Sequence, residues 1–347
     1  MTTIKDIAKL SGYSIGTVSR VINNHPDVSE EARRRVQEVI REQNFQPNSN
    51  AKQLKQQSNS AITIIVKGNE NMFFESILER VQVMLKESGE DVAVAFLDEY
   101  ANEVQTAAQL CASRKPKGFI FLGGNLEFFR QDFGKIDVPC VLLTNTAEGL
   151  ELKNLSSYTT DDMEAGRAAV EYLIQMGHTH IGIIGGSASR IGSQIGFRRM
   201  EGCKVAFDQH GLEFDENMQY EPSRFSMAGG YESAQRLLKK NPKITAVFAL
   251  GDTIALGAMR AIRDMGLSIP EDISVLGYDG IESSRYSIPR LSTIRQDTDM
   301  LAKKGVEDIL LRINYNHAVT DEFINFSLVE GESVRNLNQK RKNAKKQ

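Results

Sequence analysis

The residues with the clearest chemical pattern lie in the stretch Thr3–Asn23. Apolar residues at spacings of three and four predict two short helices separated by Gly12, a residue suited to a left-handed turn. The outward side chains of the second helix are mostly small or polar, with one guanidinium: Ile15, Gly16, Thr17, Ser19, Arg20 and Asn23. This surface suits a helix that meets base edges in the DNA major groove, where Arg20 can fork onto the two acceptors of guanine.

Three predicted helices hold this surface in place. Thr3 and Ser14 can cap the first two helices, and Ser29 can cap a third one from Glu30 to about Gln43. The side chains expected to face inward are Ile4, Ile7, Ala8, Leu10, Val18, Val21, Ile22, Ala32, Val36, Val39 and Ile40. From periodicity alone, a three-helix bundle with no role in binding nucleic acid remains open.

The string D-I-A-x-x-[AS]-G-x-S-x-x-T-V-S-R-V-[IVL]-N, at residues 6–23, resembles the lactose/galactose repressor family of bacterial regulators. The resemblance implies a helix-turn-helix DNA-binding domain at residues 1–46. It implies DNA contacts by the outward residues given above, together with Thr3 and Ser14. The partner would be a palindromic double-stranded operator, read by a homodimer because one small head buries too little area.

The next segment, residues 47–60, reads as a polar linker whose short helix would not persist alone in water. Its pattern P-N-x-x-A-[RK]-x-L resembles the hinge helix of the same family, which folds on operator DNA. The resemblance implies minor-groove contacts by Asn48, Ala51, Lys52 and Leu54. Leu54 stands at the position that wedges between base pairs.

From Ala61 the chain alternates between short apolar runs and helical stretches, which predicts parallel sheets covered by helices. The predicted strands are residues 62–66, 92–97, 118–122, 138–143, 180–184, 246–250 and 273–276, and the predicted helices are residues 74–87, 103–113, 165–176, 196–210, 229–239 and 253–265. This alternation is too long for one open sheet, so residues 61–334 are expected to form two lobes. The resemblance continues in the strings at residues 177–181, 199–202, 269–279 and 289–297. It implies two Rossmann-like lobes, similar to periplasmic sugar-binding proteins, joined by three crossings near Tyr158, Pro289 and Val319.

The resemblance also implies an effector site between the lobes, made by Phe73 or Phe74, Arg199, Phe225, Asp279 and Gln296. Charged groups that bind hydroxyl pairs and an aromatic face that covers C–H groups suit a sugar. The phenylalanines could instead be core residues, and Arg199 could simply pair with Asp279. Two departures from the family pattern leave the ligand open: Gly251 replaces the usual Asn, and Thr144 replaces an acid of some sugar-responsive members.

Other residue patterns give no enzyme, cofactor or metal prediction. The glycines near Gly182 lack a dinucleotide or Walker motif, and the pair His178 and His180 has no further ligand nearby in sequence. Asp161-Asp162 is interpreted as a helix-start pair. Three widely spaced cysteines, Cys111, Cys140 and Cys203, are expected to fill the core rather than form disulfides.

Charge is distributed unevenly along the 347 residues. Residues 1–60 hold nine Lys/Arg against six Asp/Glu, residues 61–334 hold 27 against 39, and residues 335–347 hold six and none. A basic head on an acidic body fits DNA binding through the head. We interpret 335–347 as a basic disordered tail, and no apolar run is long enough for a membrane span.

These features predict a cytoplasmic, homodimeric, sequence-specific DNA-binding regulator. The expected role is repression of carbohydrate-utilisation genes, relieved when a small sugar or sugar derivative binds between the lobes. Two alternatives stay open. One is a corepressor-dependent regulator that responds to a metabolite such as a purine, and the other is a solute-binding protein that shares the body.

Overall fold

The computed structural model describes residues 4–22, 28–43, 61–68, 71–186 and 195–338. The chain divides into two compact units, Met1–Ser58 and Asn59–Gln347. The described part of the first unit is a bundle of α1 (Ile4–Ser11), α2 (Ile15–Ile22) and α3 (Glu30–Glu42). Its core is formed by Ile7, Ala8, Val18, Val21, Val36 and Val39.

Two predicted caps of this bundle are confirmed. Ser14 Oγ accepts a hydrogen bond from the Thr17 amide at 3.1 Å, and Ser29 Oγ accepts one from the Ala32 amide at 3.3 Å. The inward assignment of Leu10 is wrong, because its side chain is 50% exposed. With 3.6 residues per turn the inward stripe continues from Ile7 to Ser11, which is buried and donates to the Ala8 carbonyl.

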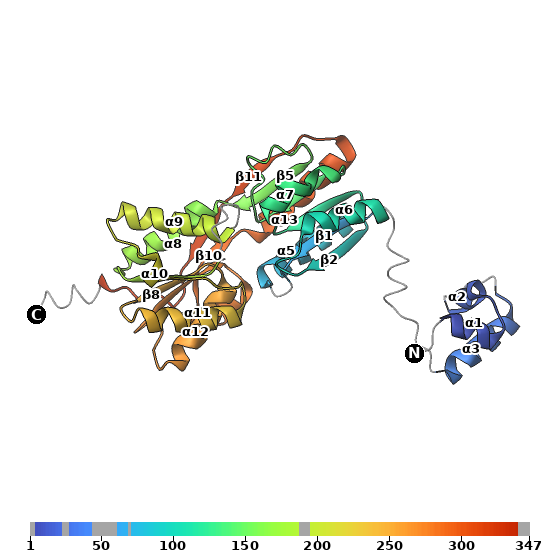
Figure 1. Ribbon diagram of the computed structural model, residues 1–347, viewed down its shortest axis with the longest axis horizontal. Coiled ribbons are helices and arrows are strands. Elements are labelled where there is room, and N and C mark those ends of the chain that lie inside the picture. The colour runs from blue at the N-terminus through green and yellow to red at the C-terminus, as the bar shows by residue number, and fades with distance from the viewer. Residues whose placement is uncertain (1–3, 23–27, 44–60, 69–70, 187–194, 339–347) are drawn as a thin grey trace, which may run out of the picture. The chain divides into compact units, whose positions relative to one another are not determined.

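The second unit contains two six-stranded sheets, each at the centre of a lobe (Figure 1). Lobe 1 has the strand order β11-β5-β4-β3-β1-β2, and the register pairs all these strands in parallel. Its strands are β1 (Ile62–Lys67), β2 (Val92–Leu97), β3 (Gly118–Leu122), β4 (Cys140–Leu143), β5 (Leu155–Thr160) and β11 (Asp321–Ile324). Its helices are α5 (Met72–Glu87), α6 (Glu103–Arg114), α7 (Leu126–Asp132), η1 (Phe133–Lys135) and α13 (Thr298–Tyr315).

Lobe 2 repeats this layered arrangement with the strand order β12-β10-β9-β8-β6-β7. Only the β10–β12 pair is antiparallel among its named strands. Its strands are β6 (Ile181–Ile184), β7 (Tyr220–Glu221), β8 (Ala246–Ala249), β9 (Ser274–Asp279), β10 (Ser292–Gln296) and β12 (Phe326–Val329). Its helices are α8 (Asp162–Gln175), α9 (Ile195–Gln209), α10 (Glu216–Gln219), α11 (Met227–Lys240), α12 (Asp252–Asp264) and η2 (Glu282–Arg285), with α8 and α9 opposite α11 and α12 (Figure 1).

Apolar side chains fill both faces of each sheet. In lobe 1 one face packs against α5 and α13, and the other packs against α6 and α7. In lobe 2 one face packs against α8 and α9, and the other against α11 and α12. The two-lobed α/β prediction is therefore confirmed. The elements that were not predicted are α7, η1, β5, α10, β7, η2, β10, α13, β11 and β12.

The chain crosses between the lobes three times, at positions that differ from the prediction. The first crossing lies between β5 and α8, at Asp161, and the second lies between β10 and α13, at Asp297. The third is Asn325, between β11 and β12. All three lie C-terminal to the predicted positions, because β5, β10 and β11 extend further before the chain changes lobes.

The segment before residue 339 is part of lobe 2. The Arg335 amide donates to Ser274 Oγ at 2.9 Å, and the Leu337 amide donates to the Met176 carbonyl at 2.8 Å. The predicted tail therefore begins too early at Arg335, while residues 339–347 lie outside the described residues. Among the described helices, none has both the length and the apolar character needed to cross a bilayer.

Candidate functional site

The predicted DNA-reading surface lies on α2. Ser14, Gly16 and Arg20 are exposed, and Thr17 is partly buried. A Cβ at Gly16 would meet only Ser14 Oγ, at 3.7 Å, so the helix surface is open at this point. A planar group, such as the edge of a base, can therefore approach the first turn of α2, and Arg20 lies in the last turn of the same helix.

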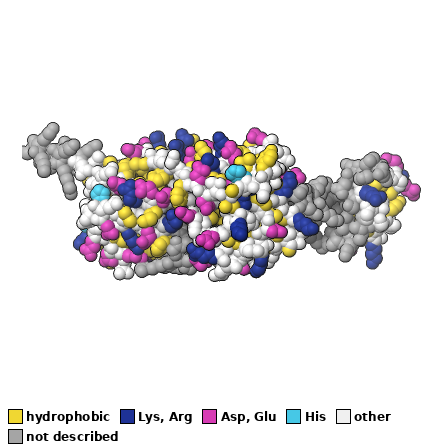
Figure 2. Space-filling model, turned by 90° about the horizontal axis from the view of Figure 1, so that it is seen from above, with side chains coloured by type: hydrophobic (Ala, Val, Ile, Leu, Met, Phe, Trp, Pro, Cys, Tyr) yellow, Lys and Arg dark blue, Asp and Glu magenta, His cyan; other side chains and the backbone are white. Residues whose placement is uncertain are grey.

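Several predicted DNA contacts cannot be placed on this surface. Ile15 and Ser19 belong to α2, but their side chains are outside the described residues. The same is true of the whole of Thr3, Asn23, Asn48, Ala51, Lys52 and Leu54. On the face of the body that Figure 2 shows, acidic and basic side chains are interspersed, so this face has no large basic field of its own.

The second candidate site is a cavity of about 1030 Å³ between the two lobes of the body. Its wall includes residues that follow β1, β2, β3 and β4 of lobe 1, and residues that follow β6 and β7 of lobe 2. Ligands of parallel α/β sheets bind at this end of the strands. Phe73, Phe74, Arg199, Phe225 and Asp279, five of the six predicted effector residues, line the cavity.

Arg199, on α9, is held in a fixed position by lobe 2. Its Nε donates to Asp162 Oδ1 at 2.7 Å, and one terminal nitrogen donates to the Leu250 carbonyl at 2.5 Å. The guanidinium carbon lies 3.6 Å from the centre of the Tyr278 ring, whose hydroxyl also donates to Asp162 Oδ1. The second terminal nitrogen is 3.8 Å from Asp279 Oδ1, so Arg199 keeps donors on the cavity side.

Asp279 ends β9 and presents a carboxylate beside Arg199. Its Oδ1 accepts a hydrogen bond from Gln296 Nε2 at 2.8 Å. Burial raises the pKa of this carboxyl to about 6, although Arg199 and Gln296 favour the charged form. Asp279 Oδ2 faces Gly251, where an added Cβ would lie 3.4 Å from it. Arg199 and Asp279 can therefore bind adjacent hydroxyls, with one donating and the other accepting.

A second buried carboxylate, Asp252, supports the turn after Asp279. Asp252 Oδ2 accepts hydrogen bonds from the Gly280 and Ile281 amides at 2.8 and 2.9 Å, and Oδ1 accepts one from Thr293 Oγ1 at 2.6 Å. Burial, and then the nearby Asp279 charge, raise the pKa of the Asp252 carboxyl well above its usual value. Asp252 positions the turn and is not among the cavity-lining residues.

The aromatic predictions have mixed outcomes. Phe73 and Phe74 belong to the core of lobe 1 but also line the cavity, so the core and cavity interpretations both hold. Phe225 packs at the edge of a lobe 2 core, and its ring lies 3.2 Å from where a Gly251 Cβ would be. A larger side chain at Gly251 would crowd both Phe225 and Asp279, so glycine fits this wall.

Gln296 does not line the cavity, contrary to its predicted place in the wall. It is 3% exposed, and its amide binds Asp279 from behind. Asp162 was likewise missed as a site residue. Asp161 caps α8 as expected, but Asp162 is buried and binds Arg199. No local sequence signal distinguishes the two aspartates, because the Arg199 contact joins residues far apart in the chain.

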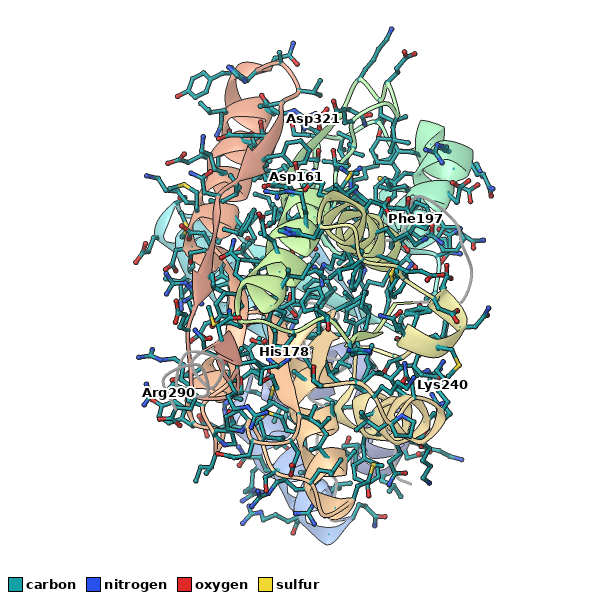
Figure 3. All side chains as sticks on the ribbon, turned by 90° about the vertical axis from the view of Figure 1, so that its left-hand side faces the viewer. Asp161, His178, Phe197, Lys240, Arg290 and Asp321 are labelled. Carbon is teal, nitrogen blue, oxygen red and sulfur yellow. The ribbon has the colours of Figure 1, made fainter. Side chains whose placement is uncertain are left out.

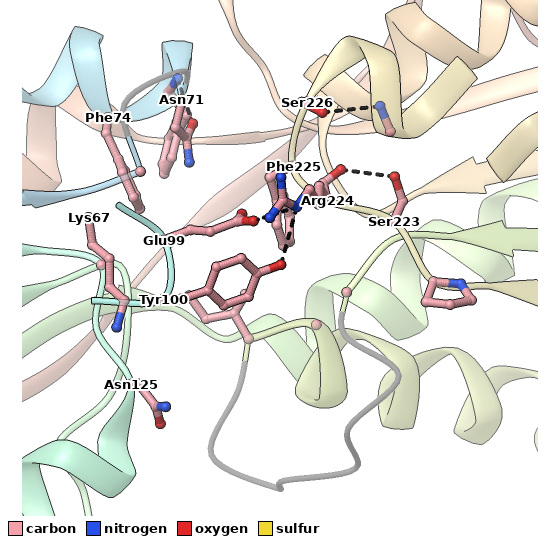
Figure 4. A pocket seen from close by; sticks show the side chains of 18 of the residues that line it. Lys67, Asn71, Phe74, Glu99, Tyr100, Asn125, Ser223, Arg224, Phe225 and Ser226 are labelled. Carbon is pink, nitrogen blue, oxygen red and sulfur yellow. Dashed lines mark hydrogen bonds and ion pairs between the residues drawn. The ribbon is translucent and has the colours of Figure 1, made fainter. Parts of the chain in front are cut away.

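Charged residues join the two lobes at the mouth of the cavity (Figure 4). Arg224 Nε, after β7, lies 2.9 Å from Glu99 Oε1 and donates to Tyr100 Oη at 3.2 Å. Glu99 and Tyr100 follow β2 on lobe 1, and the Arg224 guanidinium lies 5.1 Å from the Tyr100 ring centre. This contact was not predicted, because neither Glu99 nor Arg224 stands in one of the family strings.

Asp161 and His178, which the sequence analysis considered for acid and metal chemistry, both make structural contacts. Among those residues there is no cluster of three His, Cys, Asp or Glu side chains that could bind a metal ion. Figure 3 shows Asp161 and His178 at opposite ends of α8. The imidazole of His178 is fixed by Thr245 Oγ1 at 2.9 Å and by the Arg335 carbonyl at 3.1 Å, which is a structural role.

Comparisons with known proteins match both units. Residues 3–48 match the family described as "Bacterial regulatory proteins, lacI family", and residues 146–334 match "Periplasmic binding protein-like domain". The chain is 34% identical to the HTH-type transcriptional regulator MalR of Clostridium butyricum, over 96% of this chain and 99% of that protein.

Solved structures that are similar over nearly the whole chain include the following two. One is a lac repressor dimer bound to operator and the anti-inducer ONPF, with 25% identity, a TM-score of 0.69, and coverage of 96% of this chain and 99% of that one. The other is the complex of the transcriptional regulator CelR with cellobiose, with 26% identity, a TM-score of 0.67, and coverage of 96% and 100%.

Proposed function

The chain belongs to the LacI family of bacterial regulatory proteins, and from this premise we propose that it is a dimeric repressor whose operator affinity is set by a small saccharide bound between its lobes. Family membership makes it a DNA-binding transcriptional regulator that acts in the cytoplasm. The dimer is inferred from the lac repressor dimer, and the saccharide is inferred from the cellobiose complex of CelR.

One observation carries the saccharide assignment. Arg199 and Asp279 lie side by side in the cavity wall, and each keeps polar atoms on the cavity side after its structural hydrogen bonds are made. Phe225 adds an apolar ring to the same wall. A charged donor and a charged acceptor beside an aromatic ring are the groups that bind a sugar ring by its hydroxyls and its C–H face.

The proposed division of the chain follows the same function. Residues 1–46 read the major groove, residues 47–60 form a hinge helix on DNA, and residues 61–334 bind the effector and the second copy. Arg335–Asn338 go with the body because of their contacts with lobe 2. Residues 339–347 form the basic tail.

The crossings offer a route by which the effector alters DNA binding. Asp162, bound to Arg199, lies directly after the first crossing, and Gln296, bound to Asp279, lies directly before the second. The third crossing, Asn325, lies between Ile324, which pairs with Thr160, and Phe326, which pairs with Gln296. A ligand that moves Arg199 and Asp279 therefore acts on the crossings between the lobes, through Asp162 and Gln296. A coupling of about 1–3 kcal/mol would change operator affinity roughly 5- to 150-fold.

Fluorescence anisotropy on DNA from upstream of the protein's own gene tests this proposal. We expect specific binding that weakens when an effective saccharide is added, and a variant Asp279→Asn that binds DNA normally but does not respond. Binding that strengthens with ligand would assign a corepressor instead. Absence of specific DNA binding under every condition would refute the regulator role, and a saccharide-independent affinity would refute the effector class.

A further inference from the structure

The lobe 1 side of the cavity has polar groups that the contacts described so far do not use. Lys67 ends β1, Asn71 caps α5, Asn125 caps α7, and Thr144 follows β4. All four line the cavity, opposite the Arg199 and Asp279 wall of lobe 2. In Figure 4 the side chains of Lys67, Asn71 and Asn125 are spread along the lobe 1 side of the pocket.

Two features of Thr144 indicate that its hydroxyl contacts a ligand. Its side-chain oxygen is buried and has no hydrogen-bond partner within the protein, although the residue lines the cavity. Its backbone adopts a φ of 72°, which is rare for a β-branched residue. A buried hydroxyl without a partner is costly, and such backbone conformations gather at ligand sites. A ligand hydroxyl in the cavity would supply the missing partner.

A buried carboxylate and two aromatic rings surround this part of the cavity wall. Glu103 is fully buried, and its carboxylate accepts hydrogen bonds from Lys67 Nζ and from the backbone N–H of Asn125, both at 2.5 Å. The Lys67 ammonium lies 4.8 Å from the centre of the Phe128 ring, which also lines the cavity. Phe74 closes the other side, within 3 Å of where a Gly123 Cβ would lie. Lys67 keeps two further N–H donors for ligand hydroxyls.

The charges of the wall argue against an anionic ligand. Its four described cations are all paired with carboxylates: Lys67 with Glu103, Arg199 with Asp162, Arg224 with Glu99 and Arg236 with Glu221. Asp98, Glu99, Glu232 and Asp279 also lie in the wall. A ligand carboxylate or phosphate would therefore meet no uncompensated positive charge among the described residues.

The size of the cavity exceeds what one sugar ring needs. One hexose fills roughly six water volumes, or about 180 Å³, whereas the cavity measures about 1030 Å³. Resting on the proposed function, we infer that lobe 1 holds a second sugar subsite, formed by Lys67, Asn125 and Thr144. The effector is then an uncharged saccharide of at least two rings, with one ring bound on each lobe.

Calorimetric titration of the full chain tests this inference. The probes are maltose, cellobiose and sucrose, their monosaccharides glucose and fructose, and the anions galacturonate and glucose 6-phosphate. We expect at least one disaccharide to bind ten or more times tighter than its monosaccharides, and the anions not to bind. Tighter binding of a monosaccharide or an anion, or no disaccharide binding, overturns the inference.

The variant Thr144→Val tests the subsite because it keeps the β-branched shape and removes only the hydroxyl. We expect disaccharide affinity to fall roughly three- to tenfold and monosaccharide affinity to stay within twofold. The melting temperature of the ligand-free variant should rise, because the unpartnered hydroxyl is gone. A purely structural hydroxyl would give a lower melting temperature and no change in affinity, which would overturn the assignment.

Thr159→Val is the matched control, since Thr159 is a buried threonine of the neighbouring strand β5 and does not line the cavity. It should leave both affinities unchanged. Operator binding, measured on the same variants, separates the two proposals. If Asp279→Asn abolishes saccharide binding and Thr144→Val has no effect, the second subsite fails while the proposed function stands.

Discussion

Replacing Asp279 with Asn should make the protein more stable while removing its response to the effector. The usual pKa of this carboxyl is 3.8, and burial raises it to about 6. Between these values the folded chain binds a proton that the unfolded chain has released. The free energy of unfolding therefore falls as the pH rises from about 4 to about 6. Above that range the charged carboxylate costs about 3 kcal/mol, which Asn would not.

The Asn side chain fits the same place. Its oxygen can still accept the hydrogen bond that Gln296 donates to Asp279 at 2.8 Å. Thermal unfolding at pH 7.5, followed by circular dichroism, should show that the Asp279→Asn variant melts roughly 5 °C or more above the wild type. The difference should shrink at pH 5, where most of the wild-type carboxyl is already protonated. Saccharide affinity should fall at least tenfold, since a charged hydrogen bond is lost.

Two results would refute this reasoning. An Asp279→Asn variant that is no more stable than the wild type at pH 7.5 would mean that the buried charge is not costly. A stability difference that is the same at pH 5 and pH 7.5 would mean that the titration of Asp279 does not set it. Comparing the two proteins at each pH removes the contributions of carboxyls that are not coupled to Asp279, whereas Asp252, whose pKa the Asp279 charge raises, changes together with it.

Three further predictions concern the DNA surface and its coupling to the cavity. Arg20→Ala should cost about 1–3 kcal/mol of operator binding and relax the preference at one base pair, and anisotropy on single-base operator variants measures both; a uniform loss on all sequences would point to a phosphate contact instead. Leu54→Ala should reduce DNA bending and operator affinity while saccharide affinity stays constant, and unchanged bending in a circular-permutation gel assay would exclude the wedge role. Gln296→Leu removes the hydrogen bond to Asp279 and should bring the ratio of operator affinities, without and with saccharide, close to one. If that ratio is unchanged although the variant still binds saccharide, Gln296 does not connect the cavity to the crossings.

Much of the architecture is readable from the sequence because apolar runs report burial directly. The strands β2 and β3 have the predicted bounds, and α3 differs by one residue. The strand β5 was missed because its sequence, LSSYTT, is largely polar, yet every residue in it is buried. Some of its polar side chains bind distant residues: Arg312 from α13 donates to Ser156 Oγ at 3.3 Å, and Tyr158 Oη donates to Asp308 Oδ1 at 3.3 Å.

The residues of the candidate site were likewise only partly predictable from the sequence. Arg199 and Asp279 could be identified because they stand in family patterns, and both line the cavity. Asp162, Asp252 and the unpartnered hydroxyl of Thr144 could not, because their roles depend on contacts between segments far apart in the chain. Leu10 shows the limit at short range, since a shift of one residue on a helix exchanges an exposed position for a buried one.

The late return of the chain to lobe 1 has a consequence for its synthesis. The face of that sheet formed by Ile64, Leu122 and Leu143 is covered by α5 and α13 together, and its edge is completed by β11. A nascent chain that has left the ribosome only as far as Thr160 therefore exposes the part of this face that α13 covers until Tyr315 has emerged, and it leaves the β5 edge unpaired until Ile324 has emerged. Fragments that end between these residues should bind chaperones or aggregate, and a biosensor made by splitting the gene between the lobes would separate lobe 1 from its own last helix.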